Sequence, residues 1–128
     1  MNEDQIVDIL FRHYNSLFPK TCSSCGKKFE TFKTYVEEVT PVGRSVSYDA
    51  EVGTWGKGPA PLIGSAAMSN CTCGTTLSLT TDDMEESRRR ELLAWIKEQV
   101  DASGVAPSDI LQRLRVRVRE RVLEHSHS

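Results

Sequence analysis

The 128-residue sequence lacks any apolar run close to the roughly 20 residues needed to cross a lipid bilayer. It also has little net charge, because 16 Lys and Arg residues against 18 Asp and Glu residues leave a formal charge of -2. A polycation that coats nucleic acid is therefore excluded, and any such activity would need a local basic patch. The N-terminus is acidic where a signal peptide needs positive charge, so we expect a cytoplasmic protein.

Recognisable catalytic motifs are lacking as well. His13 is the only histidine outside the last four residues, and its place within a predicted helix favours a surface or structural role. No Ser/His/Asp set, carboxylate pair or cofactor fingerprint can be argued from the chain. The glycine-rich stretch 53–61 also lacks the Gly-Lys-Ser/Thr of a phosphate-binding loop. These absences favour a protein that is not an enzyme.

Cysteine is scarce but strictly arranged, because all four residues fall in two tight pairs. The pairs are Cys22-Ser23-Ser24-Cys25-Gly26 and Cys71-Thr72-Cys73-Gly74. Disulfides are rare in the cytoplasm, where paired cysteines more often bind metal or perform redox chemistry. Zinc takes four soft ligands in a tetrahedron, and each close pair supplies two of them. The glycine after each pair accepts a positive φ, which lets the chain turn back and aim N–H groups at the sulfurs.

The pattern therefore predicts one structural Zn²⁺ per chain, held by Cys22, Cys25, Cys71 and Cys73. A redox dithiol or disulfide, an iron–sulfur centre and unliganded core cysteines stay open as alternatives. Catalytic zinc is disfavoured, because four cysteines leave no coordination position for water. We expect Phe29 to shield the site from water, and Lys20, Lys27 and Lys28 to offset the negative charge of the thiolates.

The two Cys-Gly turns resemble the zinc-ribbon or treble-clef class, whose knuckles read Cys-x-x-Cys-Gly. The resemblance covers residues 20–80 and implies a small β module built around the metal. The second pair departs from the pattern, because a single residue lies between Cys71 and Cys73. The spacer between the pairs is long enough for a hairpin of its own. No family activity follows from the resemblance.

Composition and pattern predict a single domain over residues 1–128, with 38% hydrophobic and 27% charged residues. The predicted class is α+β: a small zinc-stapled antiparallel β module with one N-terminal helix and two C-terminal helices. The helix covers 3–18, the module covers 20–80 and the helical pair covers 82–124. Within the module we expect strands over 29–39, 45–52, 63–69 and 75–79, a turn at 41–43 and a loop over 53–61.

The last two helices are predicted from their end signals and apolar spacing. Residues 81–83 offer caps for the first of them, and Gly104 is a C-terminal stop. The second begins at Pro107 and places four apolar residues on one side, with Val116 outside that stripe. Five arginines flank the stripe: Arg113, Arg117 and Arg121 in one direction, Arg115 and Arg119 in the other. One interpretation is that these arginines line the edges of a helix that packs on the core or forms a dimer. The other is that they contact an acidic protein or a nucleic acid.

A second basic cluster, 88–90, lies close enough to Glu85, Glu86 and Glu91 to form ion pairs at helical spacing. Trp55 in the loop is either an exposed contact point or a plug on the core. Residues 123–128 could be native or the remnant of a His-containing tag, and carry no functional argument.

Together these features predict a zinc-binding regulatory or adaptor module that contacts a protein partner or a second copy of itself. The predicted contact residues are the five arginines and Trp55. Nucleic-acid binding through the arginine-rich helix is one alternative, and thiol-based redox sensing is the other. No membrane association is expected.

Overall fold

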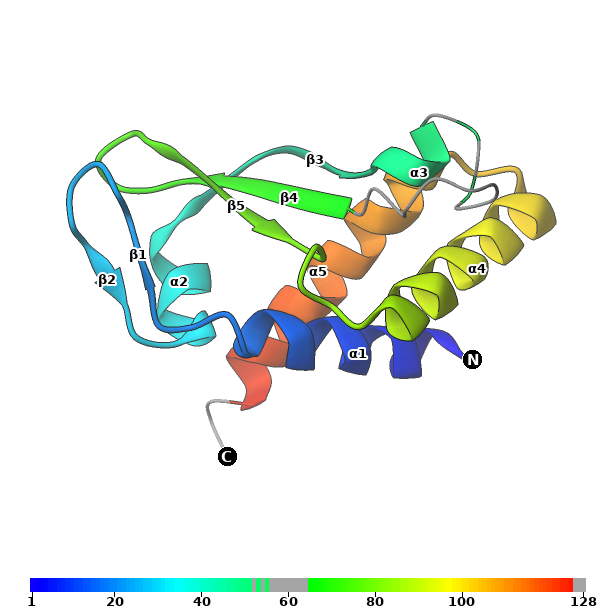
Figure 1. Ribbon diagram of the computed structural model, residues 1–128, viewed down its shortest axis with the longest axis horizontal. Helices are drawn as coiled ribbons and strands as arrows, with labels where there is room; N and C mark the ends of the chain where they lie inside the picture. The colour runs from blue at the N-terminus through cyan, green and yellow to red at the C-terminus, as the bar shows by residue number, and fades with distance from the viewer. Residues whose placement is uncertain (52, 54, 56–64, 126–128) are drawn as a thin grey trace.

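The computed structural model describes residues 1–51, 53, 55 and 65–125 and confirms the predicted α+β class (Figure 1). The elements in chain order are α1 (Glu3–Asn15), β1 (Lys20–Thr21), β2 (Lys28–Phe29), α2 (Phe32–Glu38), β3 (Thr40–Ser47), α3 (Tyr48–Glu51), β4 (Ser65–Asn70), β5 (Thr76–Thr80), α4 (Glu86–Ser103) and α5 (Pro107–His125). Besides the three predicted helices, the described residues contain two short ones, α2 and α3.

The strands form two separate antiparallel sheets. Strands β1 and β2 make a short hairpin, and β3, β4 and β5 make a meander in that order. The β1–β2 turn and the β4–β5 turn lie at the same end of the molecule, opposite the end that α4 occupies (Figure 1). The two cysteine pairs sit in these two turns.

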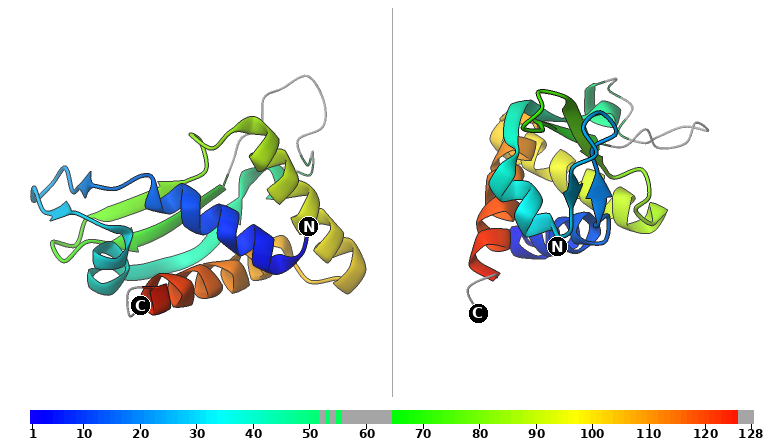
Figure 2. Two further views of the ribbon diagram at one scale, coloured as in Figure 1. Left: turned by 90° about the horizontal axis from the view of Figure 1, so that it is seen from below. Right: turned by 90° about the vertical axis from the view of Figure 1, so that its left-hand side faces the viewer.

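Helix α5 is the central helix of the core. It packs on β3, α1, α2 and α4, and α1 lies alongside it (Figure 2). Its buried residues are Ile110, Leu111, Leu114, Val118 and Val122, whereas Val116 is 45% exposed. This confirms the predicted apolar stripe and the place of Val116 outside it. No helix within the described ranges is long and apolar enough to span a bilayer.

Helix α1 begins with a reciprocal capping box. The Asn2 side chain accepts a hydrogen bond from the Gln5 backbone N–H, and the Gln5 side chain accepts one from Asn2, both at 2.9 Å. Two of the unpaired donors at the helix start are satisfied in this way. Its buried residues Ile6, Val7 and Leu10 follow helical spacing.

The predicted strand over 29–39 is wrong, because α2 occupies Phe32–Glu38. Thr31 caps this helix, and its hydroxyl accepts a hydrogen bond from the Thr34 backbone N–H at 3.2 Å. Phe32, Tyr35 and Val36 are buried, and their spacing of three and four residues is helical. The N-terminal cap and the burial of one helical face therefore outweigh the strand propensity of Thr, Phe, Tyr and Val in this segment.

The predicted turn at 41–43 is also wrong, because these residues lie inside β3. Gly43 has φ 62°, which interrupts the regular strand geometry. The register of β3 against β4 shifts at this point, between Val42 and Val46. The strand predicted over 45–52 ends at Ser47, and α3 begins at the next residue, Tyr48. The strand predicted over 63–69 is β4, and residues 63 and 64 lie outside the described residues. Of the predicted loop 53–61, only residues 53 and 55 are described.

Helix α4 begins later than predicted. It starts at Glu86 after Glu85, which makes no side-chain capping bond, and residues 81–83 do not cap it. Thr81 instead hydrogen-bonds Ser65, and its carbonyl accepts from the Met84 N–H at 3.0 Å. Gly104 ends the helix at φ 71°, as predicted.

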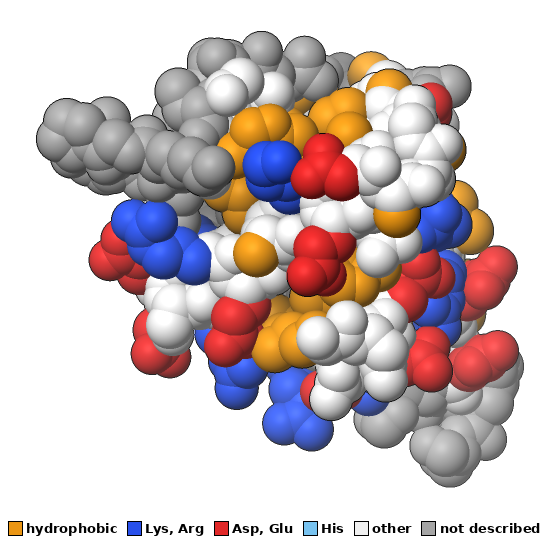
Figure 3. Space-filling model, turned by 90° about the vertical axis from the view of Figure 1, so that its right-hand side faces the viewer, with side chains coloured by type: hydrophobic (Ala, Val, Ile, Leu, Met, Phe, Trp, Pro, Cys, Tyr) orange, Lys and Arg blue, Asp and Glu red, His pale blue; other side chains and the backbone are white. Residues whose placement is uncertain are grey.

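Ion pairs cover the exposed side of α4. Two of the predicted pairs form, between Arg88 and Glu91 and between Arg90 and Glu86, whereas Glu85 accepts a hydrogen bond from the Ser87 hydroxyl. On the face of the molecule shown in Figure 3, Lys and Arg side chains alternate with Asp and Glu side chains. Among the side chains that the structure describes, this face shows no continuous basic patch of the kind that the nucleic-acid alternative requires.

Candidate metal centre

The first knuckle is the turn of the β1–β2 hairpin. Lys20 pairs with Phe29 and Thr21 with Lys28, so Cys22 leaves the ladder directly after β1. The Cys22 N–H donates to the Lys27 carbonyl, and the Gly26 N–H donates to the Cys22 carbonyl, both at 2.9 Å. Gly26 has φ 77°. These bonds fold the segment into a compact loop with the thiols of Cys22 and Cys25 on the same side as the second pair.

The second knuckle is the turn of the β4–β5 hairpin, and it is tighter by one residue. Asn70 pairs with Thr76, and the Cys71 N–H donates to the Thr75 carbonyl at 2.8 Å. The Gly74 N–H donates to the Cys71 carbonyl, also at 2.8 Å, whereas the matching bond of the first knuckle spans one residue more. The shorter Cys-x-Cys spacing is therefore accommodated by a shorter closing turn, in which Gly74 has φ 91°.

The two knuckles bring all four sulfur atoms within 4.8 Å of one another. Two of the close contacts join different knuckles: Cys22 Sγ lies 3.8 Å from Cys73 Sγ, and Cys25 Sγ lies 3.7 Å from Cys71 Sγ. A disulfide has an S–S length of about 2.05 Å, and all four cysteines are free thiols. Four cysteines in this arrangement could hold a metal ion.

Each knuckle contributes one buried and one exposed cysteine. Cys22 and Cys71 are buried in the same apolar core as Phe29, whereas Cys25 and Cys73 are exposed. Phe29 is fully buried in this core, and its shielding of the cysteines stays a prediction. An ion bound here would be anchored to the core on one side and close to water on the other.

Backbone and hydroxyl donors surround the sulfurs. The side-chain hydrogen bond between Cys73 Sγ and the Thr75 hydroxyl, 3.3 Å long, and the Thr75 backbone N–H lower the pKa of Cys73 to about 6. The Cys73 N–H lowers the pKa of the Cys71 thiol in the same way. The Lys27 N–H acts on Cys25, but desolvation and the three neighbouring thiols outweigh it and raise the pKa of Cys25 to about 11. Four adjacent thiolates repel one another, and a divalent cation would relieve that repulsion.

The lysines near the first knuckle have carboxylate partners. Lys27 pairs with Glu38 at 3.1 Å and also lies over the Phe29 ring, and Lys28 pairs with Glu30 at 3.4 Å. The positive charge of these two lysines is therefore partly neutralised by Glu38 and Glu30. The hydrogen bonds that Thr75 and the knuckle backbone make to Cys71 and Cys73 also stabilise the thiolate form.

Replacing Gly74 by alanine is expected to weaken metal binding. At φ 91° an L-residue is strained by about 1–2 kcal/mol, although no atom lies close enough to clash with the added carbon. A loss of that size corresponds to about tenfold weaker zinc binding in a competition titration. Gly104→Ala is the matched control, because φ 71° strains it similarly at the end of α4. The control should destabilise the fold and leave metal affinity unchanged. Equal affinities for Gly74→Ala and wild type would contradict the role of the tight turn.

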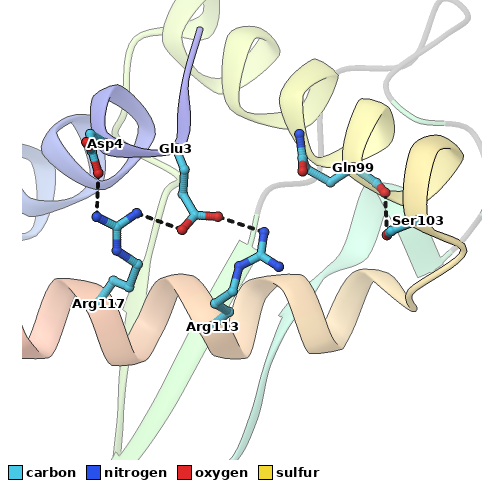
Figure 4. A network of polar contacts seen from close by, with 6 residues as sticks. All are labelled: Glu3, Asp4, Gln99, Ser103, Arg113 and Arg117. Carbon is cyan, nitrogen blue, oxygen red and sulfur yellow. Dashed lines mark hydrogen bonds and ion pairs between the residues drawn. The ribbon is translucent and has the colours of Figure 1, made fainter.

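Three of the predicted contact arginines bind helix α1. Arg113 and Arg117 both reach the Glu3 carboxylate, at 2.7 and 2.6 Å, and Arg117 also bonds Asp4 (Figure 4). Arg121 pairs with Asp8 and lies over the Phe11 ring. These side chains join the first helix to the last one. Contact with a partner through them stays a prediction, but a partner would have to compete with these carboxylates.

The other two arginines point to the opposite side of α5. Arg115 bonds the Met68 carbonyl and the Ser69 hydroxyl, and Arg119 donates to the Val36 carbonyl at 3.0 Å. Trp55 is partly buried against the core, and Lys97 lies 5.8 Å from the centre of its ring. The structure therefore brings together the four cysteines, but not the arginines and Trp55 as one surface.

Two features of the site were not found from the sequence. Thr75 follows the second knuckle and hydrogen-bonds Cys73, and the only signal for it was a hydroxyl two residues after a cysteine. The second is a cavity beside Arg115, whose lining comes from segments far apart in the chain. Comparisons with protein-family models, curated proteins and solved structures found no match to this chain.

Proposed function

We propose that Cys22, Cys25, Cys71 and Cys73 bind one Zn²⁺ ion and that this ion is structural. The observation that carries the proposal is the set of sulfur distances. Sulfurs about 2.3 Å from a central ion lie about 3.8 Å apart along the edges of a tetrahedron. The distances of 3.8 and 3.7 Å between the knuckles match that edge, and all four sulfurs lie within 4.8 Å of one another.

The same distances weigh against the alternative centres. In a [4Fe–4S] cluster each cysteine binds a different iron atom, so the sulfurs stand farther apart than around one ion. A catalytic zinc site keeps a coordination position open for water, whereas four thiolates fill a tetrahedron. Tetrahedral coordination by four thiolates favours zinc among the common single ions.

The proposed ion would join two parts of the fold that backbone hydrogen bonds do not join. The hairpin β1–β2 and the meander β3–β4–β5 share no strand within the described part of the chain. Each sheet contributes one knuckle, so a single ion crosslinks both. A two-stranded hairpin alone is at best marginally stable in water, and this gives the ion a structural role.

Metal analysis of the purified protein tests the proposal. We expect about one zinc per chain, and a cobalt-substituted sample should show the absorption of a tetrahedral thiolate site. Removal of the metal with a strong chelator should abolish the cooperative unfolding transition. Less than half a zinc per chain, together with an unfolding transition that chelation leaves unchanged, would contradict a structural zinc site. A mild oxidant separates the redox alternative, since a sensor would release zinc and form disulfides reversibly.

An adaptor role for this module is the functional part of the proposal. Arg113, Arg117 and Arg121 already bind α1, so the remaining exposed strip on α5 centres on Val116, with exposed Glu120 one helical turn beyond it. Light scattering over a concentration series tests self-association through this strip. Val116→Asp should dissociate any dimer. Val105→Asp should not, because Val105 is exposed but lies before α5. A dimer that survives Val116→Asp would exclude this strip.

A further inference from the structure

A cavity of about 80 Å³ lies between the inner face of the meander and helices α1, α2 and α5. Most of its lining is apolar, including Leu10, Leu79, Leu114 and Val118. At about 10–15 Å³ per water-sized probe, this space is equivalent to roughly five to eight waters. It is far smaller than the roughly 300–1,000 Å³ of sites for drug-sized ligands, so only a small molecule would fit.

One buried donor faces this space without a well-aligned partner. Tyr35 is 2% exposed, and its hydroxyl makes no well-aligned hydrogen bond within the described residues; the Ser69 side chain interacts with it more weakly and lowers its pKa. A tyrosine phenol is neutral at physiological pH and can donate a hydrogen bond. Burial raises the pKa of Tyr35 further from that range. A buried hydroxyl without a partner costs about 1–3 kcal/mol, and a ligand acceptor would remove that cost.

Two cations stand beside this donor at the edge of the cavity. Arg115 is half-buried, and it and Arg119 have no carboxylate partner among the residues that the structure describes. The Ser69 hydroxyl lies 3.0 Å from Arg115 Nη2, so Arg115 and Tyr35 meet around Ser69. Desolvation lowers the pKa of Arg115, and nearby Arg119 lowers it further.

The contrast within α5 shows that this arrangement is specific to one side of the helix. On the side toward α1, Arg113, Arg117 and Arg121 are each paired with carboxylates. On the side toward the cavity, Arg115 and Arg119 bond only neutral carbonyl and hydroxyl groups. The apolar cavity therefore has uncompensated positive charge at its edge. An anionic group is what such a pair of guanidinium groups binds best.

We infer that this cavity binds a short-chain aliphatic carboxylate, with its alkyl chain among the apolar side chains and its carboxylate between Arg115, Arg119 and the Tyr35 hydroxyl. The cavity volume limits the apolar part to a few methylene groups. The inference goes beyond the zinc proposal and does not depend on it, because no cysteine lines the cavity.

Titration of the full-length, metal-loaded protein with hexanoate tests the inference. We expect saturable one-site binding, followed by calorimetry or by shifts of amide resonances in α5 and β4. Hexanamide has the same chain without the charge, and should bind at least about tenfold more weakly, as the loss of a charged hydrogen bond implies. This comparison uses the wild-type protein alone. No binding at concentrations on the order of 10 mM, or equal binding of both compounds, would overturn the inference.

Variants assign the carboxylate contact. Arg115→Gln should weaken hexanoate binding at least about tenfold, and Tyr35→Phe should weaken it by a similar factor. Arg113→Gln is the matched control on the same helix, because Arg113 is exposed and bonds Glu3 outside the cavity. It should bind hexanoate like wild type. Ala67→Leu should block binding by filling the cavity without removing charge. Equal losses for Arg113→Gln and Arg115→Gln, or full binding by Ala67→Leu, would refute the site.

Discussion

Replacing Cys22 by serine is expected to leave the protein without bound zinc and without a cooperative unfolding transition. Cys22 is fully buried and directly follows β1, so it would be the inner ligand of the proposed zinc site in the first knuckle. Structural zinc contributes apparent binding free energies of about 10–16 kcal/mol in zinc-finger peptides, comparable with the whole stability of a domain. A serine at this position removes a thiolate and buries a hydroxyl that has no matched partner.

The exposed ligand of the second knuckle provides a graded comparison. Cys73→Ser removes one thiolate at the solvent side, where water can complete the coordination of the remaining three cysteines. We expect this variant to bind zinc weakly and to recover its unfolding transition in excess zinc, whereas Cys22→Ser does not. Ser24→Ala, an exposed change inside the first knuckle, should match wild type.

Circular dichroism during denaturant unfolding, together with the metal content of each variant, measures these effects. The expected order of stability is Ser24→Ala, then Cys73→Ser, then Cys22→Ser. If Cys22→Ser retained one zinc per chain and the wild-type midpoint, these four cysteines would not form a structural metal site.

The cysteine cluster was predictable because its ligands are paired locally. Two residues within a turn are neighbours in any fold, so the spacing alone predicted that Cys22 lies near Cys25 and Cys71 near Cys73. The meeting of the two pairs required an extra assumption, which was that one ion takes all four. The structure places the four sulfurs together, in agreement with that assumption.

Helix α2 was missed because two local signals conflicted. β-branched and aromatic residues favour a strand, whereas the Thr31 cap and the spacing of Phe32, Tyr35 and Val36 favour a helix. Packing decided the outcome: Phe32 and Tyr35 both meet the ring of Phe18 after α1. That contact joins segments that a local pattern cannot connect.

The arginines of α5 show a different limit. Helical periodicity correctly assigned Arg113 and Arg117 to one side and Arg115 and Arg119 to the other. It could not show that acidic residues of α1 lie opposite the first group and carbonyl oxygens opposite the second. Sequence therefore predicted the two sides of the helix but not the cavity, whose polar groups meet only after the sheet and α2 have packed.

Replacing Phe29 by alanine is expected to destabilise the fold and to speed the loss of zinc. Phe29 is fully buried and pairs across the hairpin with Lys20, two residues before Cys22, and its ring packs edge-on against Tyr35 with 5.3 Å between ring centres. Truncation of a buried phenylalanine costs about 3–5 kcal/mol through lost burial and the cavity left behind. It would also open a path for water to the inner sulfurs, which are shielded in the native protein.

Ile96→Ala separates these two effects. Ile96 is equally buried, at 1% exposure, but lies in α4 at the end of the molecule opposite the two knuckles (Figure 1). Its truncation costs about 2–5 kcal/mol, so the two variants lose similar stability. Denaturant unfolding gives the stability of each variant, and the rate of zinc transfer to a chromophoric chelator under native conditions gives the local opening of the site.

If zinc leaves by local opening of the knuckles, Phe29→Ala should release it much faster than Ile96→Ala at equal loss of stability. If zinc leaves only after global unfolding, both variants should fall on one line of release rate against unfolding free energy. The first result assigns Phe29 a protective role at the metal site. The second would reject that role, because Phe29 would then support the site only through the stability of the whole core.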